Sequence, residues 1–392
     1  SWTKSSRSEA TVQENIDTII IKSKTKIKHK YLKHVIDDVN NLSIDKNFES
    51  FIERKKQRMV SKYYFIKKKP LVDIGILSGQ KIGMIIDLVP DFNNFFSGVF
   101  GGSKLYGNDW NLNGEVDSRF ENLWGAMERI TFKWKNIDST NQSFKISLYR
   151  PHLLITGVGL KGEYNYQIVN NYFTETQFGI DIEFFNNYYG SFYVGYKQGD
   201  ITSTEQGLRK NYFSTNYKAL KFVFEHNSFN RVLLPDKGHK LDIEFDIGED
   251  KLINELYVKT KLNFIGFSNF FHKINFCLKS YNDLIKPFQG KIGLSRQISF
   301  GGVNSFRGFN DNQFKSSALS VQSLEIHYTL DKAFKIITFI DCGFAKDYYP
   351  KYSFGFGLSK ISKTALIDVQ YAVPLGSAIQ NGKVHLKWVT RL

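Results

Sequence analysis

The 392-residue sequence has few cysteines, few prolines and no long apolar run. Its two cysteines, Cys277 and Cys342, form no CxxC pair and lack the spacing of metal ligands. The seven prolines leave long segments uninterrupted. Because no run of about 18 apolar residues is present, a protein that crosses a bilayer with helices is excluded. The opening residues, Ser1 to Lys4, begin no apolar leader, so we expect a mature or trimmed chain.

Enzyme motifs are also missing. The sequence holds no Gly-x-Ser-x-Gly, no His-Glu-x-x-His and no phosphate-binding glycine loop, and its eight histidines form no constellation. We therefore expect no enzymatic activity, no catalytic residue, no metal ion and no cofactor.

Positive charge is concentrated in the first part of the chain. Residues 1–90 carry 18 Lys and Arg against 10 Asp and Glu, whereas the other 302 residues carry 35 against 28. The excess falls in short runs such as Lys67-Lys68-Lys69. A solvated basic surface near anionic lipid accounts for such runs, so the net charge of +15 does not make nucleic acid an expected partner.

From about Phe96 onward the sequence alternates between apolar and polar residues. Ile130, Phe132 and Trp134 alternate with polar neighbours, and acidic residues separate the apolar residues of 241–247. This period of two predicts strands with one polar face, which would suit a soluble sandwich as well as a barrel. Aromatic residues make up 16% of the chain, and the mean hydropathy of −0.32 is compatible with strands that face lipid on one side and a lumen on the other.

The number of segments favours the barrel. Segments begin near residues 96, 109, 126, 142, 156, 174, 190, 216, 238, 254, 270, 318, 335, 352, 365 and 382. Sixteen strands of about ten residues, an even number, predict an antiparallel outer-membrane β-barrel, a membrane all-β fold, over residues 91–392. The last segment reaches the end of the chain, where we expect it to pair with the first and close the barrel.

Residues 16–90, after an N-terminal extension at 1–15, follow a different pattern. A strand at 16–22 precedes two helical patterns, and strands at 71–77 and 81–89 flank the turn Ser78-Gly79-Gln80. The helical patterns are Tyr31, Leu32, Val35, Ile36 and Val39, then Phe48, Phe51, Ile52, Met59 and Tyr63, with Asp45 as the expected N-cap of the second. This small α/β order, β-α-α-β-β, resembles a POTRA domain, which implies a periplasmic domain that offers a sheet edge to client strands. A folded spacer is the alternative.

The longest connection, at residues 283–317, contains a recognisable motif. Gly301-Gly302 precedes Phe306-Arg307-Gly308-Phe309. This run resembles the signature loop of the superfamily that contains the barrel-assembly protein BamA and the two-partner-secretion transporters. The resemblance implies that the loop folds into the lumen and docks Arg307 on the inner wall. Phe306 stands where a smaller aliphatic residue is more usual, and Leu392 stands where such barrels usually end in an aromatic residue.

The wall that receives this loop is also visible in the sequence. Phe339, Asp341 and Gly343 resemble a second motif of the same superfamily. They share one face of a strand, which we expect to be the lumen face. A buried arginine needs a carboxylate partner, so we predict that Arg307 pairs with Asp341. In the next strand Gly355 and Gly357 point inward and are expected to clear space for the loop. By the same alternation Cys277 faces the lumen and Cys342 faces lipid, which predicts two unpaired thiols.

The first and last strands are the expected lateral gate of the barrel. Gly98, Gly101 and Gly102 weaken the pairing of the first strand, and Val384, Leu386 and Trp388 belong to the last. Glycines required only by a strand turn are the competing explanation.

The resemblance implies an insertase that assembles β-barrel proteins into the bacterial outer membrane, with its N-terminal domain in the periplasm. The implied partners are outer-membrane lipid, unfolded client proteins and accessory periplasmic or lipoprotein subunits. Two alternatives remain, a dedicated two-partner-type secretion pore for a specific client and an accessory scaffold or pore in a larger outer-membrane complex.

Overall fold

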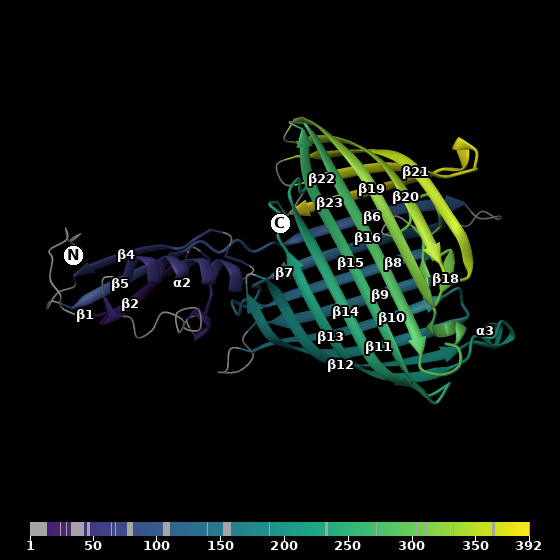
Figure 1. Cartoon of the computed structure of the whole chain (residues 1–392), viewed down its shortest axis with the longest axis horizontal. Coiled ribbons are helices and arrows are strands. Elements are labelled where there is room, and N and C mark those ends of the chain that lie inside the picture. The colour runs from purple at the N-terminus through teal and green to yellow at the C-terminus, as the bar shows by residue number, and fades with distance from the viewer. Residues whose placement is uncertain are drawn as a thin grey trace.

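A computed structural model of the chain describes residues 14–391 apart from 24, 29, 33–42, 45–47, 64, 67, 77–80, 105–109, 139, 152–157, 188, 232–233, 272, 303–304, 311, 332 and 363–364. Figure 1 shows a small α/β domain at the N-terminal side of a large barrel. We call the barrel end that carries this domain the near end, and the opposite end the far end. Among the described helices, none has the length and apolar character needed to span a bilayer.

The small domain is built on a three-stranded sheet. β5 (Ile82–Leu88) lies at its centre, parallel to β2 (Thr18–Ser23) and antiparallel to β4 (Leu71–Ile76). α2 (Phe48–Lys62) contributes Ile52 and Met59 to the same apolar core as Met84 and Ile86 of β5. A two-residue pairing joins β1 (Glu14–Asn15) to β3 (Ser43–Ile44). The three strands of the sheet and the second helix are therefore as predicted from the sequence, whereas the short pairing of β1 with β3 was not predicted.

Parts of that prediction cannot be compared. Residues 30–32 are helical, but the rest of the first expected helix, the N-cap Asp45 and the turn Ser78-Gly79-Gln80 lie outside the described residues.

The barrel consists of sixteen antiparallel strands in the described chain, closed by the pairing of the last strand, β23, with the first, β6. The strands are β6 (Phe95–Lys104), β7 (Trp110–Glu121), β8 (Arg129–Asp138), β9 (Asn141–Arg150), β10 (Gly159–Val169), β11 (Phe173–Asn187), β12 (Gly190–Ser203), β13 (Thr215–Asn227), β14 (Gly238–Asp250), β15 (Glu255–Phe271), β16 (Ile274–Pro287), β19 (Ala318–Asp331), β20 (Phe334–Ala345), β21 (Tyr348–Ile361), β22 (Ala365–Pro374) and β23 (Lys383–Arg391). The sixteen predicted segments are thereby confirmed.

Several predicted boundaries are wrong by a few residues: β16 begins at Ile274, not near 270, and β21 at Tyr348, not near 352. β8 begins at Arg129, not near 126, because residues 122–128 form a turn. β16 continues to Pro287, which pairs with Tyr257 of β15, so the predicted loop boundary at 283 is too early. The connection that enters the lumen is residues 288–317, which we call the lumen loop; it contains η1 (Leu294–Arg296), β17 (Ile298–Phe300) and β18 (Phe314–Ser316).

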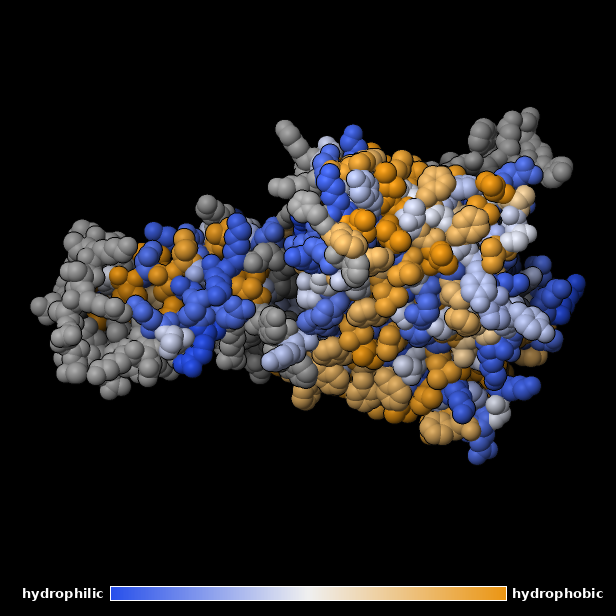
Figure 2. Space-filling view, turned by 45° about the horizontal axis from the view of Figure 1, so that its top comes forward, coloured by the Kyte–Doolittle hydropathy of each residue, from blue (hydrophilic) through white to orange (hydrophobic). Residues whose placement is uncertain are grey.

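The outer face of the barrel is apolar and its inner face is polar. Along β20, Thr338, Ile340 and Phe344 are exposed on the outside, whereas Phe339 and Asp341 are buried. Figure 2 shows apolar side chains over most of the visible barrel wall, with polar residues gathered toward its ends. Inside, lysines pair with carboxylates, as Lys221 does with Asp181 at 2.7 Å. This alternation is what a barrel in a bilayer requires.

The small domain is attached to the barrel through the turn between β7 and β8. Met127 of this turn is fully buried and belongs to the core of the small domain. The Lys28 amide donates to the Gly125 carbonyl at 2.9 Å, and the Glu128 carboxylate accepts from the Trp124 and Ala126 amides at 2.6 and 3.0 Å. The domain therefore contacts the hairpin next to β6, the first strand of the barrel.

Candidate functional site

The tip of the lumen loop is a tight backbone turn. The Gly302 amide donates to the Phe306 carbonyl at 3.0 Å, and the Phe306 amide donates back to Gly302 at 2.9 Å. Gly301 and Gly302 have φ angles of 126° and 90°, a backbone region that glycine adopts without a steric cost. The Ser305 hydroxyl donates to the Gly301 carbonyl at 2.9 Å. This geometry holds the next residue, Arg307, in one position.

Arg307 is buried against the barrel wall and paired with Asp341 of β20. Its Nε donates to Oδ2 at 2.8 Å and its NH2 to Oδ1 at 2.5 Å, a bidentate pair. The Arg307 amide also donates to Oδ2 at 3.2 Å. Arg307 is 4% exposed and Asp341 1%. The predicted contact between the two residues is confirmed, and charge-assisted pairs of this kind are the strong hydrogen bonds of protein interiors.

A second carboxylate contacts Arg307 and was not predicted from the sequence. Glu325 of β19 lies 2.7 Å from NH1 of Arg307. It also lies 2.6 Å from the Lys279 ammonium and 2.7 Å from Nε2 of His327. The alternation of residues along β19 is enough to predict that Glu325 points inward. Its position beside Asp341 depends on the β19–β20 register, in which Ser323 faces Asp341.

Neutral wall residues complete the surroundings of the guanidinium. NH2 donates to Ser323 Oγ at 2.5 Å and NH1 to Gln370 Oε1 at 3.1 Å. The Phe339 ring lies under the guanidinium, with its centroid 3.4 Å from Cζ of Arg307. Side chains of three strands, β19, β20 and β22, thus jointly fix the loop tip to the wall.

Phe306 explains why Gly343 has no side chain. A Cβ placed on Gly343 would lie 2.5 Å from Cε1 of Phe306, whose ring is fully buried. The ring belongs to an apolar cluster with Phe300, Phe314 and Val321. Phe306, which stands where a smaller aliphatic residue is more usual, therefore fills the space above Gly343.

Gly355 and Gly357 have a different role from the one predicted. A Cβ on Gly355 would lie 2.4 Å from Cζ of Phe339, and one on Gly357 would lie 2.8 Å from Cγ of Gln370. The atoms nearest to both positions belong to the wall, and they include backbone oxygens of Tyr371 and Val369 as well as the two side chains. The two glycines make room for the residues that contact Arg307 rather than for the loop itself.

Replacing Gly343 by valine tests the packing of the loop tip. The added methyl groups would collide with Phe306, so we expect Gly343→Val to lower the free energy of unfolding by about 1–3 kcal/mol. Phe306→Leu in the same chain should recover part of this loss. Urea unfolding of the purified protein in detergent measures both effects.

The control for this experiment is Gly162→Val in β10, because a Cβ on Gly162 meets no atom within 4 Å. Equal losses from the two valine substitutions would show that the Phe306 contact does not explain Gly343.

The inner wall also gathers three groups of the kind that bind metals. Donor atoms of Cys277, Glu325 and His327 all lie within 4.8 Å of one another. The Glu325 carboxylate, however, is already occupied by Arg307, Lys279 and His327, so a metal ion would have to displace these contacts. The thiols behave as predicted, since Cys277 and Cys342 are both free.

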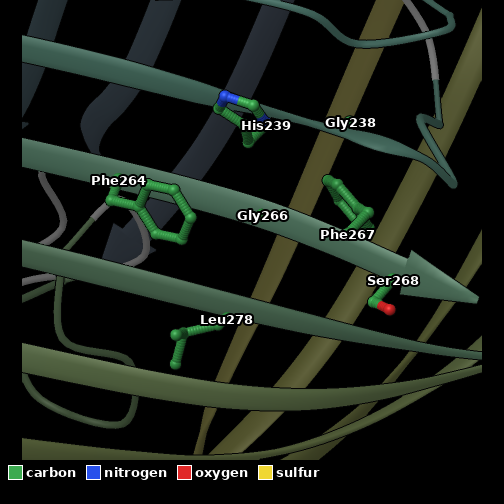
Figure 3. Close-up of a pocket in the computed structure, with 7 residues that line it drawn as sticks. All are labelled: Gly238, His239, Phe264, Gly266, Phe267, Ser268 and Leu278. Atoms are coloured by element: carbon green, nitrogen blue, oxygen red, sulfur yellow. The ribbon is translucent and has the colours of Figure 1, made fainter.

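A shallow hollow on the wall is separate from the loop site. It surrounds Gly266 of β15, with His239 and Leu278 on the neighbouring strands, as Figure 3 shows. Its lining residues come from β14, β15 and β16, and none belongs to the lumen loop. It is therefore no part of the Arg307 site.

The boundary between β23 and β6, which we call the seam, is the second candidate site. Four residue pairs join these strands, from Trp388 opposite Gly98 to Arg391 opposite Phe95. The adjoining boundaries are longer, with ten pairs between β6 and β7 and eight between β22 and β23. Among the predicted gate residues only Gly98 and Trp388 are paired across the seam. Gly101, Gly102, Val384 and Leu386 lie beyond the described pairing.

A closed barrel with an apolar outer face, and a loop fixed to its inner wall by a buried arginine, defines a class of transmembrane β-barrel. The Omp85 superfamily domain matches residues 107–389, and the chain belongs to the Omp85 superfamily. This fold places the protein in the bacterial outer membrane.

Solved structures from two branches of this superfamily are similar to the chain. BamA from Haemophilus ducreyi lacking POTRA domains 1–3 has a TM-score of 0.62 at 16% identity, covering 95% of this chain and 83% of that one. CdiB from Acinetobacter baumannii has a TM-score of 0.63 at 12% identity, with coverages of 97% and 74%. CdiB from Escherichia coli has a TM-score of 0.56 at 11% identity, with coverages of 100% and 92%. Among curated proteins, no sequence matches this chain.

Proposed function

We propose that this Omp85 barrel is an insertase that assembles β-barrel proteins into the outer membrane. Its small domain is a POTRA-like domain in the periplasm, so the near end of the barrel faces the periplasm. It receives unfolded clients, with accessory periplasmic or lipoprotein subunits as further partners, and the role is non-enzymatic. The protein acts by holding and releasing client strands.

The short seam is the observation that carries this proposal. Backbone N–H and C=O groups in a bilayer must be paired within the protein, since lipid offers no partners. Continuing the register at the seam would put Gly102 opposite Val384, but the described pairing ends at Gly98. Each ladder hydrogen bond contributes about 0.5–1.5 kcal/mol, so a boundary of four pairs is the least costly one to open. A client strand could take the place of the missing pairs.

The edges of the small sheet support the same function. β2 and β4 are the outer strands, so each has a side that no described strand of the sheet covers. Leu71 and Ile76 of β4 are 66% and 48% exposed. An uncovered edge with exposed apolar residues can bind an extended segment through backbone hydrogen bonds, with little dependence on its sequence.

Secretion of one dedicated client is the second candidate. It is favoured by the fold, which is as similar to CdiB, with TM-scores of 0.63 and 0.56, as to BamA, with 0.62. In that case the client would pass through the lumen, and the lumen loop would have to leave it.

Depletion of the protein in its native host, followed by quantitative proteomics of the outer membrane, separates these functions. An insertase predicts a broad fall across many barrel proteins. Loss of one or a few surface or secreted proteins would instead establish the dedicated transporter. An unchanged outer membrane would contradict both and leave a scaffold or pore.

A further inference from the structure

The first leg of the lumen loop, the part that contains η1, is bound to other strands of the wall than those that bind Arg307. Arg296, at the end of η1, is 8% exposed and its Nε donates to Asp250 Oδ2 of β14 at 2.9 Å. Its guanidinium carbon lies 3.4 Å from the ring centroid of Tyr217 on β13 and 4.9 Å from that of Tyr257 on β15. Three neighbouring strands therefore bind one side chain of the loop.

The wall around Arg296 is shaped independently of the loop. Asp250 accepts the Thr215 hydroxyl at 2.6 Å and the Leu252 amide at 3.0 Å, which fixes the carboxylate before Arg296 arrives. Tyr257 is fully buried and Tyr217 is 2% exposed. A carboxylate and two aromatic faces, held in place by their own strands, form a preorganised site for a planar guanidinium.

The returning leg of the loop contacts the same side of the barrel. The Lys315 ammonium of β18 lies 4.5 Å from the Tyr212 ring centroid and 5.0 Å from that of Phe173, at the start of β11. Burial lowers the pKa of Lys315 to about 8, so the amine is still mostly protonated at neutral pH and its charge lies over the aromatic surface. On the first leg, Ser295 Oγ donates to the Phe213 carbonyl at 2.9 Å.

The Lys315 contacts and the Arg307 site lie on opposite walls, and the Arg296 contacts lie on the strands between them. In the closed strand order, eight strands in one direction and six in the other separate β11, which Lys315 contacts, from β22, which Arg307 contacts through Gln370. Phe173 follows the connection between β10 and β11, and Tyr212 lies in the connection between β12 and β13. Both connections are at the far end of the barrel, so the loop crosses the mouth there. In Figure 1 β18 and α3 (Glu205–Arg209) lie together at that end.

We propose that Arg296 is a second anchor of the lumen loop, a positioning residue that acts independently of Arg307 and keeps the far mouth closed. Arg307 holds the tip on β19, β20 and β22, whereas Arg296 holds the base on β13, β14 and β15. With both anchors in place and Lys315 over Phe173 and Tyr212, the loop spans the mouth. The closed mouth leaves the seam as the route for a client, and this last consequence alone rests on the proposed function.

Conductance in planar bilayers tests whether Arg296 closes the mouth. We use the purified full chain carrying Cys342→Ser, and compare it with Arg296→Ala. Loss of the charged hydrogen bond is expected to raise the open probability roughly tenfold or more. Arg209→Ala, at an exposed arginine of the same end, is the matched control and should leave it unchanged.

A second readout separates the two anchors. Cys277 is fully buried and faces Glu325, the carboxylate that Arg307 contacts, so we expect its reaction with a thiol reagent to report whether the loop tip has left its site. Arg296→Ala should open the mouth while Cys277 stays protected, and Arg307→Ala should expose Cys277. An unchanged conductance of a folded Arg296→Ala chain, or equal exposure of Cys277 in both variants, would overturn the proposal of two independent anchors.

Asp250→Asn covers the case in which Arg296→Ala does not fold. It keeps the stacking on Tyr217 and Tyr257 and removes the charge, so the open probability should rise less than in Arg296→Ala but still above wild type. A conductance equal to wild type in this variant also overturns the proposal. No client is present in these measurements, so they test the second anchor separately from the proposed function. The anchor can be confirmed even if proteomics contradicts the insertase, and the insertase can be confirmed even if the anchor is contradicted.

Discussion

Replacing Arg307 by alanine is expected to release the tip of the lumen loop and to lower the free energy of unfolding by about 3–5 kcal/mol. The reason is that Asp341, 1% exposed, would stay buried without its cation. Glu325 would keep Lys279 and His327, so the loss is concentrated at Asp341. Urea unfolding in detergent measures the stability, and protease cleavage within residues 288–317 measures the release of the loop.

Arg307→Lys should behave almost like the alanine variant. A lysine ammonium cannot form the bidentate pair with Asp341 while also reaching Glu325 and stacking on Phe339. Arg209→Ala, which removes an exposed arginine, should have no effect. Full stability and an uncut loop in a folded Arg307→Ala chain would contradict the assignment of Arg307 as the residue that fixes the loop tip.

The alternation of side chains between the two faces of each strand made much of the barrel predictable. The alternation of apolar and polar residues placed Phe339, Asp341 and Gly343 on the inner face and Cys342 on the outer one, because successive side chains of a strand point to opposite faces. The same rule, with the Arg-Gly-Phe motif, was enough to pair Arg307 with Asp341. Those inferences need only the sequence of one strand and the position of one loop.

Register and loop path were not predictable in the same way. Glu325 has the correct parity, but only the β19–β20 pairing puts it beside the Arg307 site. Arg296 has no signal at all, since its partners Asp250, Tyr217 and Tyr257 are brought together by three separate strands. The sequence also does not say that the seam stops at Gly98, because the alternation of β6 and β23 continues past that residue.

Locking the seam is expected to abolish client insertion. Ser97 and Val389 face each other across it and are both buried, so cysteines at these positions lie at a separation that a disulfide can bridge. The background carries Cys277→Ser and Cys342→Ser, which removes the native thiols. Because the barrel stays closed and intact, the stability of the oxidised chain should not fall, whereas its activity should be lost and should return on reduction.

A second disulfide in the same barrel is the matched control. Thr131 and Ser147 face each other between β8 and β9, away from the seam. A cross-link there adds the same chemistry to a boundary that has nine described pairs, and it should leave insertion unchanged.

The most direct test of the proposed function is therefore the folding of an unfolded outer-membrane barrel client in vesicles that contain the oxidised Ser97→Cys/Val389→Cys chain. We expect no client folding above the level of empty vesicles before reduction, and full activity after it, with the Thr131→Cys/Ser147→Cys chain active throughout. Equal client folding by the locked and the control chains would show that clients do not pass the seam, and would contradict the proposed mechanism.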